Sequence, residues 1–355
     1  RARLPQYRRR LMNALKTSAP LLLAAAFVLC GCEKPDDTFR LLWRAGEVPA
    51  QLVARFGEQT GTKPVVETYS DDEELATNLS AKDKNYDLVQ AEGHAVQALA
   101  NQGLLRRLDH SEIPNLRNIA PEFLKLPFDP GAVYSAPFMA GFVGIVYNAE
   151  TVTVPIVGFS DVFRPQHAGR IVVGGDAREI ASCAFLAAGI PINEAGDDNL
   201  AKISPLLAAW IPGVKVFDPP DPKAALLEGD ADIGIVRSGD AAQLFAANPR
   251  FQWVLPAEGV RMFVTALAIP KSARHADAAE ALINFLLRPE SGKALSDEFA
   301  GFNPNAEARK LLGEAQLENP ASYPAGLGAA RREMFGDIGV QAAKIKQLVA
   351  PQKTP

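Results

Sequence analysis

The chain has 355 residues, of which 48% are hydrophobic and 22% charged, and its formal net charge at pH 7 is −4. These proportions are typical of a folded globular protein and exclude an intrinsically disordered chain. The acidic balance argues against a nucleic acid partner, because binding of the phosphate backbone requires clustered Lys and Arg. The length suits about two domains of ordinary size.

Residues 1–32 have the organisation of an export signal. Basic residues from Arg1 to Lys16 precede an apolar run at 21–28, and none of the 32 residues is acidic. The run is shorter than the roughly 20 residues of a membrane-spanning helix but fits a signal peptide. The four residues after it, Leu-Cys-Gly-Cys at 29–32, resemble the lipobox of bacterial lipoproteins. That resemblance implies cleavage before Cys32 and a lipid on its sulfur; the alternative is an ordinary signal peptide that contains cysteine.

We therefore expect a periplasmic or otherwise extracytoplasmic protein that is anchored to a membrane through Cys32, with residues 33–37 as the tether. Removal of residues 1–32 leaves 31 basic and 41 acidic residues, a net charge of −10. Beyond Cys32 the only cysteine is Cys183, so no intrachain disulfide can form. Cys183 lies in an apolar stretch, and we expect it to be a small buried hydrophobic residue.

Short apolar runs alternate with amphipathic segments along the rest of the chain. The predicted strands lie at 39–43, 64–69, 86–89, 144–147, 170–173, 214–217, 232–236 and 263–269. The predicted helices lie at 49–61, 96–101, 199–210 and 278–287, and the tail at 330–349 is also helical in pattern. The sequence Asp-Pro-Pro-Asp-Pro at 218–222 is interpreted as a loop that enters a helix. Alternation of this kind predicts an α/β protein with mostly parallel sheets covered by helices, and we expect two sheets.

Several short motifs, in order, resemble the periplasmic spermidine/putrescine-binding proteins of bacterial polyamine ABC importers. They are FGEQTG at 56–61, YDLV at 86–89, KLPFDP at 125–130, DARE at 176–179, LAIP at 267–270, INFLLRPE at 283–290 and ARKLL at 308–312. The resemblance covers nearly all of the chain after the leader. It implies a two-lobed periplasmic-binding-protein clamp in which each lobe is a mostly parallel sheet covered by helices and crossover strands join the lobes. By the same analogy, residues 38–140 and 264–309 form lobe one, and residues 141–263 and 310–350 form lobe two.

The resemblance also suggests ligand contacts. A polyamine requires carboxylates for its ammonium groups and aromatic faces along its methylenes. Two acidic contacts of the family fall at Asp176 and Glu179 and are retained. Other family positions are altered; they fall at Arg44 (beside Trp43), Glu47, Glu92, His94, Arg237, Phe263, Thr265, Gly301 (beside Phe302) and Phe335.

These changes leave three interpretations open. In the first, Glu47 or Glu92 replaces the aspartate that has become Thr265, and the cleft still binds a cation, with Phe263 and Trp43 against its methylenes. In the second, Arg44 and Arg237 recruit an anionic or zwitterionic solute. In the third, the arginines pair with the carboxylates and stabilise the lobes, as buried charges require.

The sequence therefore predicts a monomeric solute-binding lipoprotein that captures a small polyamine-like cation of the putrescine or spermidine type. It would present the ligand to the permease of an ABC importer; the alternative is a sensor that reports the ligand to a membrane signalling partner. We expect no enzymatic activity and no cofactor, because the sequence has no nucleophile elbow, phosphate loop or dinucleotide fingerprint. We expect no metal, because the four histidines, at 94, 110, 167 and 275, lack ligand spacing.

Overall fold

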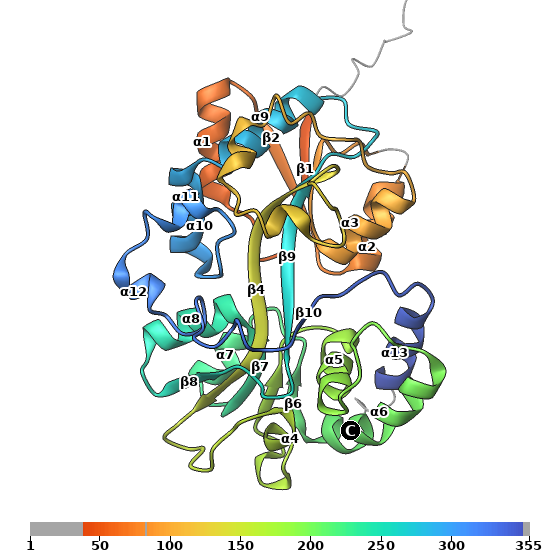
Figure 1. Ribbon diagram of the computed structural model, residues 1–355, viewed down its shortest axis with the longest axis vertical. Helices are drawn as coiled ribbons and strands as arrows, with labels where there is room; N and C mark the ends of the chain where they lie inside the picture. The colour runs from red at the N-terminus through yellow and green to blue at the C-terminus, as the bar shows by residue number, and fades with distance from the viewer. Residues whose placement is uncertain (1–37, 82–83, 351–355) are drawn as a thin grey trace, which may run out of the picture. The chain divides into compact units, whose positions relative to one another are not determined.

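Two long antiparallel strands, β4 (Ser135–Asn148) and β9 (Val260–Ala268), connect the two halves of the fold (Figure 1). The computed structural model describes residues 38–81 and 84–350, and Phe39 onward forms one unit. The predicted signal peptide, Cys32 and the tether lie outside the described residues.

The strands of the described chain form one sheet in the order β2-β1-β3-β9-β4-β7-β5-β6, with β8 paired to β4 and β10 paired to β9. The remaining strands are β1 (Phe39–Arg44), β2 (Pro64–Tyr69), β3 (Leu88–Glu92), β5 (Ile171–Val173), β6 (Val214–Phe217), β7 (Ile233–Arg237), β8 (Phe251–Val254) and β10 (Arg332–Glu333). The expectation of two sheets was wrong. The strands β4 and β9 pair from Ser135↔Ala268 to Val143↔Arg261 and so join the strands of both halves into one sheet.

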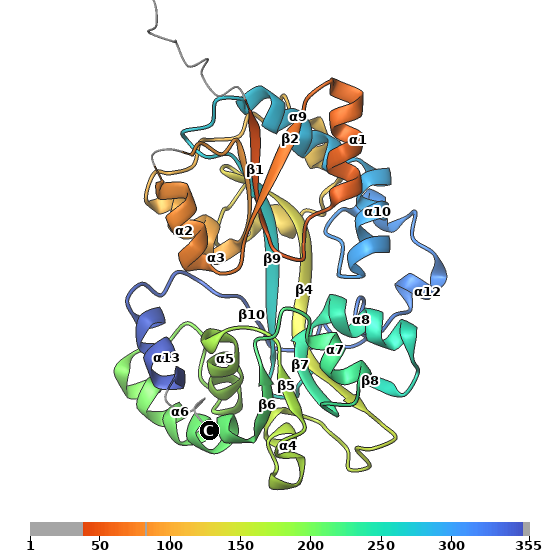
Figure 2. The same cartoon turned by 180° about the vertical axis from the view of Figure 1, so that it is seen from behind.

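Helices cover this sheet on both sides (Figures 1 and 2). The first part of the chain contributes α1 (Ala50–Thr60), α2 (Asp72–Ser80) and α3 (Gly93–Asn101). The middle contributes α4 (Phe159–Val162), α5 (Ala177–Ala187), α6 (Asp197–Trp210), α7 (Pro222–Leu227) and α8 (Ser238–Ala247). The last part contributes α9 (Ala276–Leu286), α10 (Pro289–Phe299), α11 (Ala306–Arg309), α12 (Glu314–Leu317) and α13 (Gln341–Val349). Short 3₁₀ turns lie at 114–118, 123–125, 165–167 and 211–213.

Most predicted elements are confirmed in type and place, but the C-terminal tail is not. The pattern at 330–349 predicted one helix, whereas the structure has β10 at Arg332–Glu333 and a helix only at Gln341–Val349. Between them lie Gly336 and Gly339. Gly339 has a φ of 55°, a left-handed backbone conformation that glycine adopts without steric strain and that interrupts a helix.

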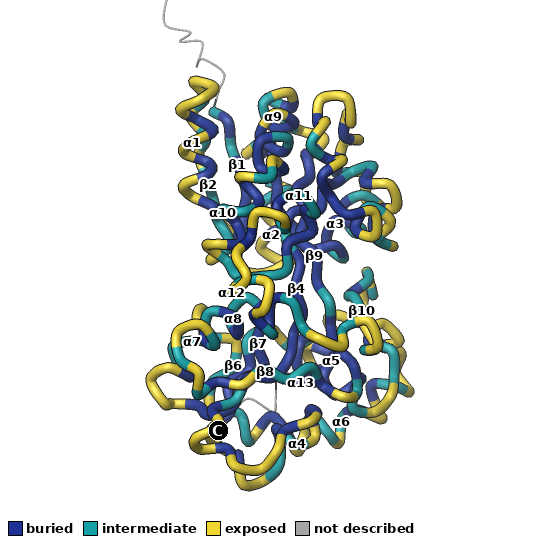
Figure 3. Tube along the Cα trace, turned by 60° about the vertical axis from the view of Figure 1, so that its left-hand side comes forward, coloured by how far each residue is buried: buried dark blue, intermediate teal, exposed yellow. Residues whose placement is uncertain are grey.

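The buried residues gather into two large hydrophobic cores, which follow the strands (Figure 3). The first core draws on residues 39–140 and 264–295, and the second on residues 143–263 and 335–349. A smaller cluster around Val236 and Phe251 packs on the other face of the second half. Cys183 is completely buried in the second core, as expected. None of the described helices has the length and apolar composition needed to cross a membrane.

Candidate functional site

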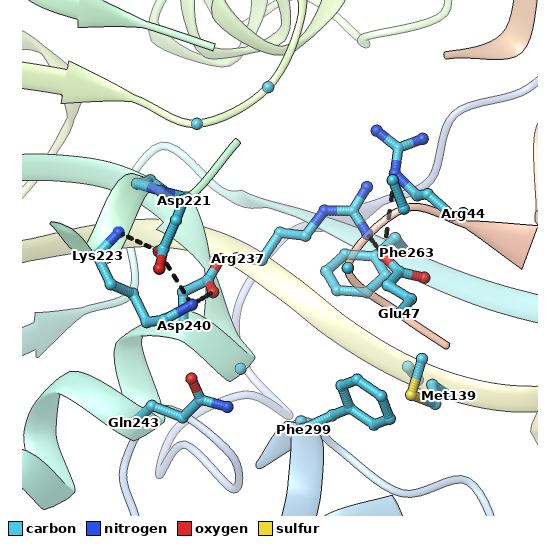
Figure 4. Close-up of a pocket in the computed structure, with 18 of the residues that line it drawn as sticks. Arg44, Glu47, Met139, Asp221, Lys223, Arg237, Asp240, Gln243, Phe263 and Phe299 are labelled. Carbon is cyan, nitrogen blue, oxygen red and sulfur yellow. Dashed lines mark hydrogen bonds and ion pairs between the residues drawn. The ribbon is translucent and has the colours of Figure 1, made fainter. Parts of the chain in front are cut away.

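A cavity of about 750 Å³ lies where residues of both halves meet. Its walls come from the loop after β1, from the middle of β4, from the loop before α7, from the start of α8 and from the end of α10 with its following loop. Its charged residues are Arg44, Glu47, Asp218, Asp221, Lys223, Arg237 and Asp240, and its aromatic residues are Phe138, Phe263, Phe299 and Phe302. Lys223, Asp221 and Asp240 gather on one side, and Arg44 and Glu47 on the other (Figure 4).

Strand ends position the central charges. Arg44 is the last residue of β1, Glu92 of β3 and Arg237 of β7, and a helix begins directly after Glu92 and Arg237. In a sheet covered by helices, the strand ends form the crevice in which ligands bind, because the connecting loops separate there. The fold therefore brings together side chains that are 145 residues apart, such as Glu92 and Arg237.

Three glutamates and two arginines form a continuous ion-pair chain, which we call the ladder: Glu47, Arg237, Glu92, Arg261 and Glu179. Arg237 donates from Nη1 to Glu47 Oε1 over 2.9 Å and from Nη2 to Glu92 Oε1. Arg261 donates from Nη1 to Glu92 Oε2 over 3.2 Å. Arg261 also binds both oxygens of Glu179, from Nε over 2.9 Å and from Nη2 over 2.5 Å. Each interior carboxylate is thus paired with a guanidinium, as buried charges require.

The electrostatics of the ladder keep Glu92, Arg237 and Arg261 charged. Burial would raise the pKa of Glu92, but the charges of Arg237 and Arg261 hold it well below its ordinary value. Burial would lower the pKa of both arginines, but Glu92 with Glu47 raises that of Arg237, and Glu179 with Glu92 raises that of Arg261.

Aromatic rings flank the guanidiniums of Arg237 and Arg261. The carbon of the Arg237 guanidinium lies 4.5 Å from the centre of the Phe263 ring, and that of Arg261 lies 4.3 Å from the centre of Phe335. Arg178 stacks on Phe335 at 4.0 Å, and burial together with the charge of Arg261 lowers the pKa of Arg178 to about 10. These contacts are cation–π interactions, which are stronger where water is excluded.

Several residues singled out in the sequence line the cavity or the ladder. Arg44, Glu47, Arg237, Phe263 and Phe302 line the cavity. Glu92 and Glu179 are nearly fully buried, and both are bound by Arg261.

The other predicted contacts do not line the cavity. Asp176 is exposed and caps α5, where its Oδ1 accepts from the backbone N–H groups of Arg178 and Glu179. Trp43 is 0% exposed and packs edge-on against Phe138 at 5.8 Å.

Thr265, His94 and Phe335 also lie away from the cavity. Thr265 is completely buried in β9, opposite Glu92 in the sheet. His94 Nε2 lies 2.6 Å from Asp72 Oδ2, and its ring lies edge-on to Phe335 at 5.7 Å.

Several residues of the site were not predicted from the sequence. Arg261 is a single charged residue within the apolar strand β9, and a lone charge in such a run was a signal that it needs a buried partner. Lys223 forms ion pairs with Asp221 at 3.1 Å and Asp240 at 2.7 Å. Phe299 adds an aromatic wall at the end of α10.

The segment at 218–222 is the expected loop into a helix, and it has a second role. Asp221 caps α7 by accepting from the backbone N–H of Lys223 over 2.9 Å. All five residues of the segment also line the cavity, which no local sequence pattern could indicate. Within residues 38–81 and 84–350, no group of three or more His, Cys, Asp or Glu side chains is arranged to hold a metal ion.

The structure has two hydrophobic cores that are joined by crossing strands, and residues of both halves line a charged and aromatic cavity. This arrangement is that of a two-lobed solute-binding protein. The chain belongs to the bacterial extracellular solute-binding proteins, whose family model matches residues 51–325. This confirms the predicted fold class and the resemblance found in the sequence.

Individual relatives agree with this assignment. The spermidine/putrescine-binding periplasmic protein of Salmonella typhimurium is 30% identical over 92% of this chain and 96% of its own. A Listeria monocytogenes protein assigned to a spermidine/putrescine ABC transporter superposes with a TM-score of 0.84 at 25% identity, over 89% of this chain and 99% of its own. The TpPotD lipoprotein of Treponema pallidum superposes with a TM-score of 0.78 at 25% identity, over 89% and 99%.

Proposed function

We propose that this protein is the solute-binding component of an ABC importer and that it captures a small polyamine-like cation in the cavity. The observation that carries the ligand class is the composition of the cavity wall. Four carboxylates, of Glu47, Asp218, Asp221 and Asp240, accompany four phenylalanine rings. Carboxylates pair with ammonium groups, and aromatic faces cover methylenes. The spermidine/putrescine-binding relatives support the same class.

Capture follows from the way both halves line the cavity. Glu47 precedes α1 in the half that holds the first core, whereas Asp221 and Asp240 belong to the half that holds the second. A ligand that contacts both sides at once stabilises the closed arrangement over the open one, because those contacts exist only when the lobes meet. The permease would then recognise the closed form. We propose residues 38–140 with 264–309, and 141–263 with 310–350, as these two lobes.

We propose further that Cys32 carries a lipid that keeps the protein at the outer face of a membrane, and that the protein acts as a monomer without catalysis. The lipobox at 29–32 supports the anchor, as does the lipoprotein relative of Treponema pallidum. The expected result is that the full chain, expressed in bacteria, sediments with membranes and incorporates labelled palmitate, and that Cys32→Ala abolishes the incorporation. A Cys183→Ala control must still incorporate the label; incorporation by both variants, or by neither, would contradict the anchor.

A second candidate ligand is a small zwitterion or anion. Arg44, Lys223 and Arg237 also line the cavity. Arg44 approaches Glu47 only to 4.0 Å through Nε, so its terminal nitrogens can receive an acidic group of a ligand. This observation favours a solute that carries a carboxylate beside an amine.

A thermal-shift panel on the protein from Glu33 onward tests the proposed function. The panel contains putrescine, cadaverine, spermidine, norspermidine, agmatine, amino acids and simple anions. A ligand that binds only the folded state raises the unfolding midpoint, by an amount that grows with its concentration over Kd. We expect at least one amine to do so. A shift with anions alone would exclude the cationic ligand and leave the second candidate.

A further inference from the structure

The environment of Arg237 is that of a bound cation. Its guanidinium lies 4.5 Å above the face of Phe263 and donates to Glu47 and Glu92. An aromatic face with two carboxylates is the surrounding that an organic ammonium group would require. Here the chain supplies that cation itself, from the last residue of β7 (Figure 4).

Every carboxylate of the ladder already has a cationic partner. Glu92 is held by Arg237 and Arg261, and Glu179 is held through both oxygens by Arg261. Glu47 accepts from Arg237 and also from the side-chain amide of Gln90, over 2.7 Å. An additional ammonium group at this end would meet guanidiniums whose carboxylates are already engaged, and like charges repel in a site of low dielectric.

The opposite side of the cavity has the reverse balance. Asp218, Asp221 and Asp240 line it together with one cation, Lys223. Lys223 Nζ contacts Asp221 at 3.1 Å and Asp240 at 2.7 Å, while Asp218 is exposed and also lines the cavity. Three carboxylates and one ammonium give this part of the cavity wall a net negative charge, which attracts the cationic end of a ligand.

We propose that Arg237 determines specificity by occupying one cation subsite, so that the native cavity takes an amine with a single cationic end. That end binds among Asp218, Asp221 and Asp240, and the other end, uncharged or acidic, lies beside Arg237 and Arg44. This inference rests on the proposed function, since it names which polyamine-like ligands the same cavity selects.

Three ligands with the same four-carbon chain test it. Putrescine has an ammonium group at both ends, N-acetylputrescine replaces one with a neutral acetamide, and 4-aminobutanoate replaces one with a carboxylate. Isothermal titration of the full chain in detergent should show at least one single-cation ligand binding tenfold or more tightly than putrescine. Whichever single-cation ligand binds more tightly shows whether the cavity accepts a neutral or an acidic group at the second end of the ligand.

The variant Arg237→Ala should reverse this order, because Glu47 and Glu92 then lose the guanidinium between them and can take the second ammonium of putrescine. We expect the ratio of the putrescine affinity to that of the single-cation ligand to rise at least tenfold. Arg237→Lys retains a cation and should keep the native order. If Arg237→Ala does not fold, Arg237→Gln serves in its place, since its amide still hydrogen bonds to a glutamate.

The matched control is Arg164→Ala, which removes an arginine ion-paired to Asp161 away from the cavity; its ligand order should stay native. Tighter putrescine binding by the native protein, or an unchanged ratio in Arg237→Ala, would overturn the role of Arg237 while leaving amine capture intact. If neither protein binds any of the three ligands or the larger polyamines, amine capture fails, and the inference with it.

Discussion

Buried charges make individual residues of the ladder far more consequential than surface ion pairs. The side chains of Arg261 and Glu92 are only 3% and 7% exposed. The pair of Lys310 and Glu307, by contrast, is 69% and 45% exposed. Water screens the second pair, whereas removal of one partner from the first leaves a carboxylate with little solvent to stabilise it.

Arg261→Met should therefore lower the free energy of unfolding by about 3–5 kcal/mol, because Glu92 and Glu179 lose a shared partner. Lys310→Ala, the surface control, should cost less than about 1 kcal/mol. Urea unfolding of both variants checks the difference. Equal losses would show that the Arg261 pairs are screened like surface ones.

The pKa of Glu92 gives a pH dependence of known sign. The folded state holds it well below 4.5, so ionised Glu92 stabilises the fold above that pH, and this contribution is lost as the pH falls through the folded value. Glu92→Gln should flatten the fall of the unfolding free energy below about pH 4.5, by up to about 1.4 kcal/mol per pH unit. Glu122→Gln, at an exposed site, should leave the slope unchanged; an unaltered slope in Glu92→Gln would contradict the pairing.

The sequence identified four of the five residues of the ladder. Glu47, Glu92, Glu179 and Arg237 were recognised as candidate site residues because family motifs carry them to those positions. Arg261 was not, since its partners lie 82 and 169 residues away along the chain. Local spacing contains no information about pairing over such separations.

At the scale of single elements, local sequence patterns located most strands and helices but did not show which of them line the cavity. The motif at 176–179 shows the distinction. Its aspartate and glutamate lie three residues apart and were expected to face one ligand, yet helix α5 begins between them. Asp176 therefore stays at the helix end as a cap, and Glu179 turns into the interior toward Arg261.

Because Asp176 caps helix α5, its substitutions should differ in their effect on stability. Asp176→Asn should leave stability and ligand affinity nearly unchanged, because an asparagine side chain also accepts from the N–H groups of Arg178 and Glu179. Asp176→Ala should cost about 1 kcal/mol of stability by losing that cap. Thermal unfolding and ligand titration measure the two effects. A tenfold loss of amine affinity in Asp176→Asn would instead place this carboxylate at the ligand, as the family resemblance implied.

At the scale of the whole folded unit, the ladder connects residues that belong with different cores. Glu47 and Glu92 lie beside elements of the first core, and Glu179 and Arg237 beside elements of the second. Two further links join the halves: Lys346 of α13 pairs with Glu73 of α2 at 2.9 Å, and the backbone N–H of Asp337 donates to Gln97. The α/β clamp was predictable from strand and helix rhythm and from family motifs. Pairing of the arginines with the carboxylates was one of three interpretations of the sequence, which could not choose among them because it did not identify Arg261.

These links predict that the ligand-free protein is already partly closed. Arg237→Ala removes the contacts of one half to Glu47 and Glu92 at once, so the open state should gain population. For a folded chain of this length the radius of gyration is about 20 Å, and small-angle X-ray scattering of the ligand-free variant should give a larger value than that of the native protein. Arg164→Ala should scatter like the native protein. A saturating amine should return Arg237→Ala to the native value, because the ligand's ammonium then replaces the guanidinium between the same carboxylates. Superimposable ligand-free curves for Arg237→Ala and the native protein would mean that β4, β9 and the C-terminal links set the spacing of the lobes without the ladder.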